Sequence, residues 1–195
     1  MRGRLWLHYF VSAVREKKPT KKNLGAGQWT EFLGAIMDEV GKRMNCHVVR
    51  RRPKDKKFSG EYLSIDVMFI DDAEYDLRIG EERDWDPFVL PRAVVELENR
   101  FDSQKISFCL WKILCVRAPV RALVCCQKNN DKVAALKQQL ENIIWRGSLT
   151  KGSDGDLFVI IGDESVVGTK APWRDYFSVY EWRNDRLEKI EGLEW

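Results

Sequence analysis

The sequence has only two histidines, no cysteines at CxxC spacing and no long apolar segment. No apolar run approaches the roughly 20 residues that a membrane-spanning helix needs. The short apolar stretch within residues 1–14 is followed by basic residues and by no small-residue cleavage site, so we expect no signal peptide. The five cysteines include no CxxC pair, which argues against a structural zinc site. These absences favour a cytoplasmic protein with no membrane partner, whose thiols are free and buried.

The composition is that of a globular domain. The chain has 195 residues, of which 44% are apolar and 32% are charged, and this length fits one domain with a core of its own. The net charge of +3 is small, but basic residues are concentrated in two stretches, at 15–22 and 50–57. The second stretch contains a closely spaced set of cations: Arg50, Arg51, Arg52, Lys54, Lys56 and Lys57. It predicts either a solvated loop or a contact with nucleic-acid phosphates.

Apolar spacing predicts an α/β fold. Residues at helical spacing indicate helices over 28–44, 102–116 and 131–145, and residues 1–14 fit either a helix or a strand. Runs rich in β-branched and aromatic residues predict strands at 46–51, 62–70, 93–98, 121–126, 157–161 and 176–182. Long helices after short strands imply a mixed central sheet flanked by helices on both faces.

Three carboxylates interrupt the predicted strands at 62–70 and 93–98. Strand alternation makes Asp66 the one charge in an apolar strand centre, and it places Glu96 and Glu98 on one face of the next strand. Buried carboxylates two residues apart repel each other unless a positive group compensates them. A magnesium ion would do so, because it prefers oxygen ligands. The alternative is a solvated sheet face on which the two glutamates alternate with core residues.

Three short motifs follow one another along the sequence. They are Gly27-Gln28-Trp29-Thr30-Glu31 at the start of a helix, Ser64-Ile65-Asp66-Val67 in a strand, and Val94-Val95-Glu96-Leu97-Glu98 in the next strand. In this order and spacing, residues 27–126 resemble the PD-(D/E)xK nuclease superfamily, which includes restriction enzymes and archaeal Holliday-junction resolvases. The resemblance implies one domain over 1–195 with a restriction endonuclease-like αβββαβ core at 27–126. Residues 1–26 would be an N-terminal extension, and 127–195 would add a C-terminal helix and strands.

The resemblance also implies roles for single residues. Asp66 looks like the metal-binding aspartate of the family, and Glu96 looks like the acidic residue of its second half-motif. Glu98 stands where the family usually has a lysine that orients or activates water, although some restriction enzymes have glutamate there. In other members that lysine lies on the following helix, where Lys105 or Lys112 would correspond to it.

The first predicted helix carries a further candidate. Glu31 resembles a helix glutamate that reaches the same site in resolvase-like members, and Glu39 is the alternative. The implied activity is hydrolysis of phosphodiester bonds, of DNA by family habit, with Mg²⁺ or Mn²⁺ as the cofactor. Asp66 and Glu96 would hold the metal, Glu98 would share it or accept a proton, and the basic residues at 50–57 would position the backbone. A homodimer is compatible with this function.

Two other functions stay open at this point. The chain could be a catalytically inactive PD-(D/E)xK-fold module that binds nucleic acid or a protein, because the motif lysine is replaced. It could also be a regulatory or toxin–antitoxin component that recognises a protein partner, with some of its eight tryptophans as anchors.

Overall fold

The structure is a computed structural model that describes residues 2–17, 26–50, 64–73, 90–147, 155–167 and 175–193. Its helices and strands follow each other in the chain as α1 (Arg2–Lys17), α2 (Ala26–Met44), β1 (Cys46–Arg50), β2 (Val67–Asp71), β3 (Ala93–Glu98), α4 (Ser103–Leu114), β4 (Val120–Gln127), α5 (Asn130–Gly147), β5 (Asp156–Asp163), the 3₁₀ turn η3 (Glu164–Val166), β6 (Phe177–Arg183) and β7 (Arg186–Lys189). Among these residues, no helix is both long and apolar enough to cross a bilayer.

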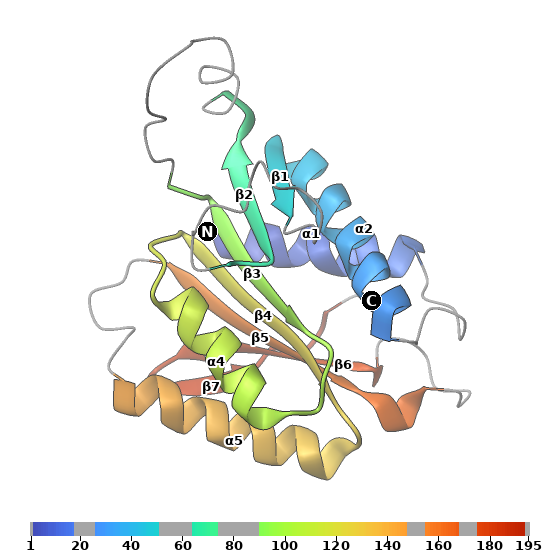
Figure 1. The fold of residues 1–195 in the computed structure, drawn as a ribbon, viewed down its shortest axis with the longest axis vertical. Helices are drawn as coiled ribbons and strands as arrows, with labels where there is room; N and C mark the ends of the chain where they lie inside the picture. The colour runs from blue at the N-terminus through green and yellow to red at the C-terminus, as the bar shows by residue number, and fades with distance from the viewer. Residues whose placement is uncertain are drawn as a thin grey trace.

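The seven strands form one mixed sheet in the order of the sequence, from β1 to β7 (Figure 1). The three central strands β3, β4 and β5 are parallel, whereas β1, β2, β6 and β7 each pair antiparallel to their neighbours. The two parallel pairings are each bridged by a helix, α4 and α5, because a parallel connection needs a crossover. The predicted α/β class with a mixed sheet is therefore confirmed.

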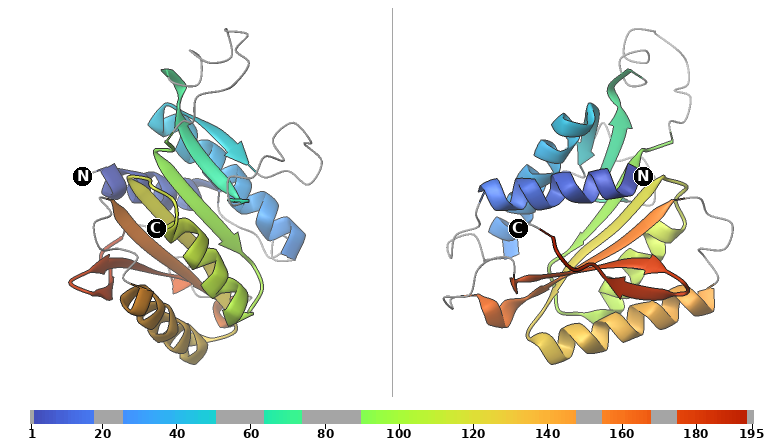
Figure 2. Two further views of the ribbon diagram at one scale, coloured as in Figure 1. Left: turned by 60° about the vertical axis from the view of Figure 1, so that its left-hand side comes forward. Right: turned by 180° about the vertical axis from the view of Figure 1, so that it is seen from behind.

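Helices cover both faces of this sheet. Helices α4 and α5 lie in front of the sheet in Figure 1, and α1 and α2 cover its other face, which Figure 2 shows from behind in its right-hand view. Each face has its own apolar cluster. The strands supply both by alternation, so that Val95 belongs to the cluster under α1 and α2, and Val94 to the cluster under α4 and α5.

The helices and strands described between α2 and β4 follow each other in the order αβββαβ. The predicted helices 28–44, 102–116 and 131–145 correspond to α2, α4 and α5. The second strand starts later than expected, at Val67 in place of residue 62. Ser64 has a φ of 50°, which no extended strand allows, so the strand cannot run through this residue. Asp66 consequently lies at the entrance of β2 and not at its centre.

The last strand, β7, lies beyond 176–182, the last strand predicted from the sequence. Asn184 and Asp185 have φ angles of 50° and 60°, and they connect β6 to β7. Two successive residues with positive φ make a tight hairpin turn, and Asn and Asp tolerate this conformation better than most residues. The chain therefore folds back and adds a paired edge strand, in which Leu187 is buried.

The N-terminal helix α1 contributes buried side chains to the apolar cluster that it shares with α2. Trp6 and Phe10 are fully buried, and the Trp6 ring stacks on the rings of Phe10 and Phe158, at centroid distances of 5.6 and 6.1 Å. The free, buried thiols predicted from the sequence are found at four of the five cysteines. The exception is Cys115, which is exposed at the end of α4.

Candidate acidic site between β2, β3 and α4

Asp66 and Glu96 are held against each other by the pairing of β2 with β3. In this antiparallel pair Val67 lies opposite Val95. Asp66, just before β2, is therefore next to Glu96 of β3. The Asp66 backbone N–H donates to Glu96 Oε1 at 3.2 Å, and the Leu97 backbone N–H donates to Asp66 Oδ2 at 3.0 Å. Each carboxylate is thus fixed by the other strand, and both lie beside α4.

The positive partner of this pair is Lys112, from the last turn of α4. Its Nζ lies 2.7 Å from Glu96 Oε2 and also donates to the Ser64 carbonyl oxygen at 3.2 Å. The side chains are almost wholly buried, with 9% of Lys112 and 1% of Glu96 exposed. A buried charge is stable only when it is compensated, so Lys112 and Glu96 depend on each other.

Burial raises the pKa of Glu96 to about 7, and the nearby Asp66 charge adds to this effect. Lys112 and Cys109 act in the opposite direction, because a cation and a hydrogen-bond donor favour the carboxylate. Burial and Glu96 in turn raise the pKa of the Cys109 thiol, which therefore stays protonated. The site contains one carboxyl group that changes its charge close to neutral pH.

Glu98 does not join the pair. Although it follows Glu96 on the same face of β3, its Oε1 accepts the backbone N–H of Arg100 at 2.9 Å, where the strand ends and the chain turns toward α4. Within the described ranges, no three His, Cys, Asp or Glu side chains come close enough to hold a metal ion. The structure thus forms a pair of carboxylates with a lysine, and not the expected cluster of three carboxylates.

The other predicted site residues lie away from the pair. Glu31 is exposed on α2, which covers the opposite face of the sheet, and Glu39 forms an ion pair with Arg43 at 3.0 Å. Lys105 is exposed in the first turn of α4, so the lysine that reaches the acidic site is Lys112. Residue Thr30, which precedes Glu31, accepts a hydrogen bond from the Asn99 side chain just beyond β3, which ties the start of α2 to this end of the sheet.

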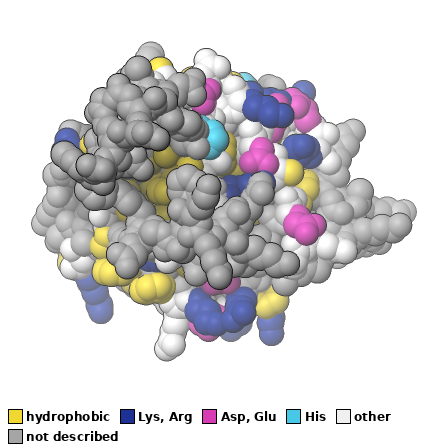
Figure 3. All heavy atoms as spheres, turned by 45° about the horizontal axis from the view of Figure 1, so that its top comes forward, with side chains coloured by type: hydrophobic (Ala, Val, Ile, Leu, Met, Phe, Trp, Pro, Cys, Tyr) yellow, Lys and Arg dark blue, Asp and Glu magenta, His cyan; other side chains and the backbone are white. Residues whose placement is uncertain are grey.

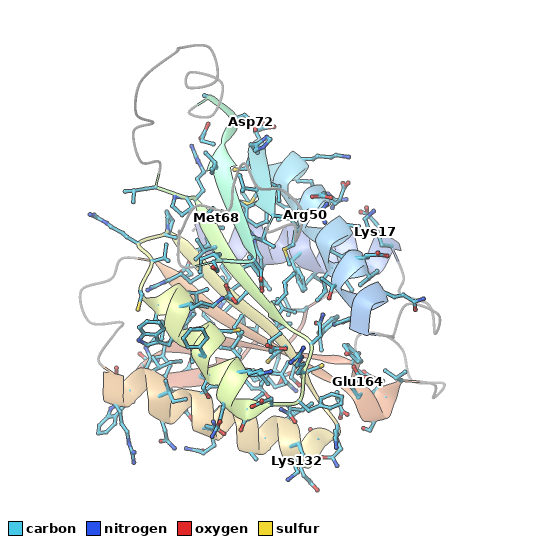
Figure 4. All side chains as sticks on the ribbon, viewed as in Figure 1. Lys17, Arg50, Met68, Asp72, Lys132 and Glu164 are labelled. Carbon is cyan, nitrogen blue, oxygen red and sulfur yellow. The ribbon has the colours of Figure 1, made fainter. Side chains whose placement is uncertain are left out.

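Of the predicted phosphate-binding residues, the structure describes Arg50 alone. It is the last residue of β1, and its Nη2 pairs with Asp38 of α2 at 3.0 Å (Figure 4). Arg51, Arg52, Lys54, Lys56 and Lys57 lie outside the described residues. In Figure 3 the described basic and acidic side chains are interspersed on the end of the molecule that carries β1 and β2, without a patch of one sign.

A second polar group, which the sequence analysis did not find, lies at the carboxyl ends of β4 and β5. The Tyr176 hydroxyl donates to Glu164 Oε1 at 2.8 Å, and burial raises the pKa of both Tyr176 and Cys126, that of Cys126 to about 12. The Tyr176 ring packs where a side chain at position 162 would lie, so that only glycine fits there. A lone glycine inside an apolar strand is the signal that could have indicated such a close approach.

The chemistry of the acidic site suits a hard divalent cation. Glu96 Oε2 is buried and pairs with Lys112, and the half-buried Asp66 carboxylate lies beside Glu96. Two carboxylates are the usual protein contribution to a magnesium site, with water and substrate phosphate as the remaining ligands. Comparison of the chain with models of known families, with curated proteins and with solved structures finds no match.

Proposed function

We propose that this protein is a metal-dependent nuclease whose site consists of Asp66, Glu96 and Lys112. The observation that carries the proposal is the meeting of these three side chains, from the entrance of β2, from β3 and from α4. The described elements around them follow in the order αβββαβ. This combination supports the resemblance to PD-(D/E)xK nucleases. It also supplies, from the following helix, the lysine that the sequence motif lacks at Glu98.

In this proposal each residue has a separate task. Asp66 and Glu96 would hold Mg²⁺ or Mn²⁺, which lowers the pKa of water and neutralises charge on the phosphate when it is bound. Lys112 favours the ionised form of Glu96 and places its ammonium group beside the carboxylate, where it can orient a water molecule or stabilise a phosphate oxygen. Glu98 positions the turn at Arg100 and does not itself take part.

The test compares cleavage of supercoiled DNA, linear DNA and RNA by wild type, Asp66→Asn and Lys112→Met, with Mg²⁺ or Mn²⁺. We expect each substitution to reduce the rate by about a hundredfold or more. Lys42→Met, in an exposed residue of α2, is the matched control and should keep the wild-type rate. Absence of cleavage with either metal, or equal cleavage by wild type and Asp66→Asn, would refute the proposal.

A catalytically inactive binding module is the second candidate. It is favoured by one specific observation, the complete burial of Glu96 against Lys112, because a closed ion pair holds the strands together without a metal. This candidate predicts that Mn²⁺ leaves the thermal unfolding temperature unchanged and that nucleic acid binds equally well to wild type and Asp66→Asn. A rise in unfolding temperature with Mn²⁺ that is lost in Asp66→Asn would exclude it.

A further inference from the structure

The outer surface of α4 carries a pair of aromatic rings that nothing in the described structure covers. Phe108 and Trp111 are 57% and 43% exposed, and their rings stack with centroids 5.6 Å apart and planes inclined by 23°. Gln104 and Cys115, at helical spacing from them, are exposed on the same side. We call the four residues Gln104, Phe108, Trp111 and Cys115 the α4 stripe. Exposed single apolar residues are ordinary, but two large rings stacked together in solvent indicate a binding surface.

Positive charges accompany the rings. Lys112 Nζ lies 5.8 Å from the centroid of the Phe108 ring, and Lys128 Nζ lies 5.8 Å from the ring of the exposed Phe101, just before α4. Residues 100–117 contain four basic side chains and one acidic side chain, Asp102. The Asp102 carboxylate accepts hydrogen bonds from the backbone N–H groups of Gln104 and Lys105 at the start of α4. Lys112 is compensated by Glu96, but Arg100, Lys105 and Arg117 are exposed. Their charge is complementary to a polyanion.

A shallow groove of about 490 Å³ on the neighbouring helix α5 extends this surface. It is lined by amide, apolar and basic side chains: Ala135, Gln138, Gln139, Asn142, Ile143 and Arg146. Its lining contains no carboxylate among the described residues. Gln139 donates to Ser107 Oγ of α4 at 3.0 Å, which joins the groove to the helix of the α4 stripe. Figure 1 shows the two helices together on the front face of the sheet.

We infer that the α4 stripe and the α5 groove bind single-stranded nucleic acid. Unpaired bases would stack on Phe108 and Trp111, and the backbone would contact Lys105 and Arg146. Stacked exposed aromatics with interleaved cations are the recurring surface for single strands, because a duplex hides the faces of its bases. A protein partner that bound this surface by apolar burial alone would gain little from the surrounding cations.

The position of the α4 stripe connects it to the acidic site. Lys112 contacts Glu96 with its ammonium group and lies over the Phe108 ring, so the two surfaces are separated by one side chain. A strand stacked on Phe108 would bring its phosphates close to Asp66 and Glu96. The inference rests on the proposed function in assigning hydrolysis to that site, but binding of the strand is measured without it.

The first experiment measures fluorescence anisotropy of labelled oligothymidylate and oligouridylate of about 15 nucleotides, and of a duplex of equal length, in EDTA. We expect wild type to prefer the single strands and Phe108→Ala/Trp111→Ala to bind them at least about tenfold more weakly. Trp111→Phe should keep most of the affinity and Trp111→Leu should not, because leucine is apolar but has no π face. Leu5→Ala, in an exposed residue on the opposite side of the sheet, is the control.

The second experiment measures the salt dependence of binding. Removing one phosphate contact should lower the slope of log affinity against log salt concentration by about 0.7 for a single strand. We expect this change for Lys105→Gln and no change for Lys42→Gln, an exposed lysine of α2. Circular dichroism melting of all variants checks that they are folded.

Several results would overturn the inference. These are equal binding of duplex and single strand, unchanged binding by Phe108→Ala/Trp111→Ala, full affinity in Trp111→Leu, and a dimer in sedimentation that this double substitution dissociates. The last result would assign the α4 stripe to a second copy of the chain. Single-strand binding in EDTA without cleavage in Mg²⁺ or Mn²⁺ would refute the nuclease proposal alone. Cleavage that persists while the stripe variants bind like wild type would refute this inference alone.

Discussion

The charge of Glu96 depends on a balance of opposing effects within a few ångströms. Burial and Asp66 favour its protonated form, whereas Lys112 and Cys109 favour the carboxylate, and the resulting pKa is about 7. The carboxyl group would have a pKa of 4.5 in the unfolded chain, so the folded protein binds this proton more tightly. Stability and protonation are therefore coupled at this residue.

The sign of this coupling leads to a prediction. A raised folded-state pKa contributes stability that is fully present below pH 4.5 and is lost as the pH rises through about 7. Glu96→Gln has no titrating group at this position. As the pH rises from 4.5 to about 7, its free energy of unfolding should therefore increase by about 3 kcal/mol relative to that of wild type. Urea unfolding of both proteins at a series of pH values measures the difference. Parallel pH profiles would contradict the prediction.

Replacing Lys112 alone should lower the free energy of unfolding more than replacing Lys112 and Glu96 together. Lys112→Met leaves Glu96 buried beside Asp66 without its compensating charge, and we expect a loss of about 3 kcal/mol or more above pH 7. The double variant Glu96→Gln/Lys112→Met should recover most of this loss. Chemical denaturation of the single and double variants tests the coupling, with Lys42→Met as the exposed control. Additive effects would show that the two side chains are independent.

At the residue scale, strand alternation together with the family resemblance predicted that Asp66 and Glu96 lie close together. Strand alternation also predicted that Glu98 belongs to the site. Alternation gives the face of a side chain but not its hydrogen bonds, and the Glu98 carboxylate accepts the Arg100 backbone N–H where β3 ends. The contact of Lys112 with Glu96 depends on how α4 crosses the sheet, which no local pattern encodes. The sequence could propose Lys105 and Lys112 as alternatives, but it could not choose between them.

At the scale of elements, the pairing of β5 with β6 requires a residue without a side chain, Gly162. Gly162 lies opposite Phe177 in this pair, and the Tyr176 ring fills the space that a Cβ would need. Gly162→Ala should lower the free energy of unfolding by about 1–3 kcal/mol, because the buried ring has no room to move. Gly27→Ala is the matched control, since nothing lies within 4 Å of its Cβ position near the start of α2. It should be neutral or stabilise the helix.

Helices were predicted more accurately than strands, for a physical reason. The apolar stripes of α2, α4 and α5 extend over three or more turns, so a local irregularity does not obscure them. Strands are short, and one residue with positive φ decides where they begin or reverse. Ser64 shortens β2 in this way, and Asn184 with Asp185 creates β7. The Asn-Asp pair was a recognisable turn signal, whereas Ser64 carried none.

At the scale of the whole molecule, the sheet separates two apolar clusters, and α1 completes one of them. Trp6→Ala would leave a large cavity between α1 and β5, and we expect a loss of about 3–5 kcal/mol. Leu5→Ala, next to it but 48% exposed, should change the free energy of unfolding by less than about 0.5 kcal/mol. Denaturant melts of both variants measure the contrast. Equal effects would mean that α1 does not pack as described.

The exposed thiol of Cys115 determines how the purified protein must be handled. It is the one exposed cysteine of five, and it belongs to the α4 stripe, four residues after Trp111. In air, two molecules can join through this sulfur, and the resulting covalent dimer would cover Phe108 and Trp111 on both copies. A preparation kept without reductant would then lose the surface inferred to bind nucleic acid while its fold stays intact. The same accessibility makes Cys115 a single attachment point for a maleimide dye that reports directly on occupancy of the α4 stripe.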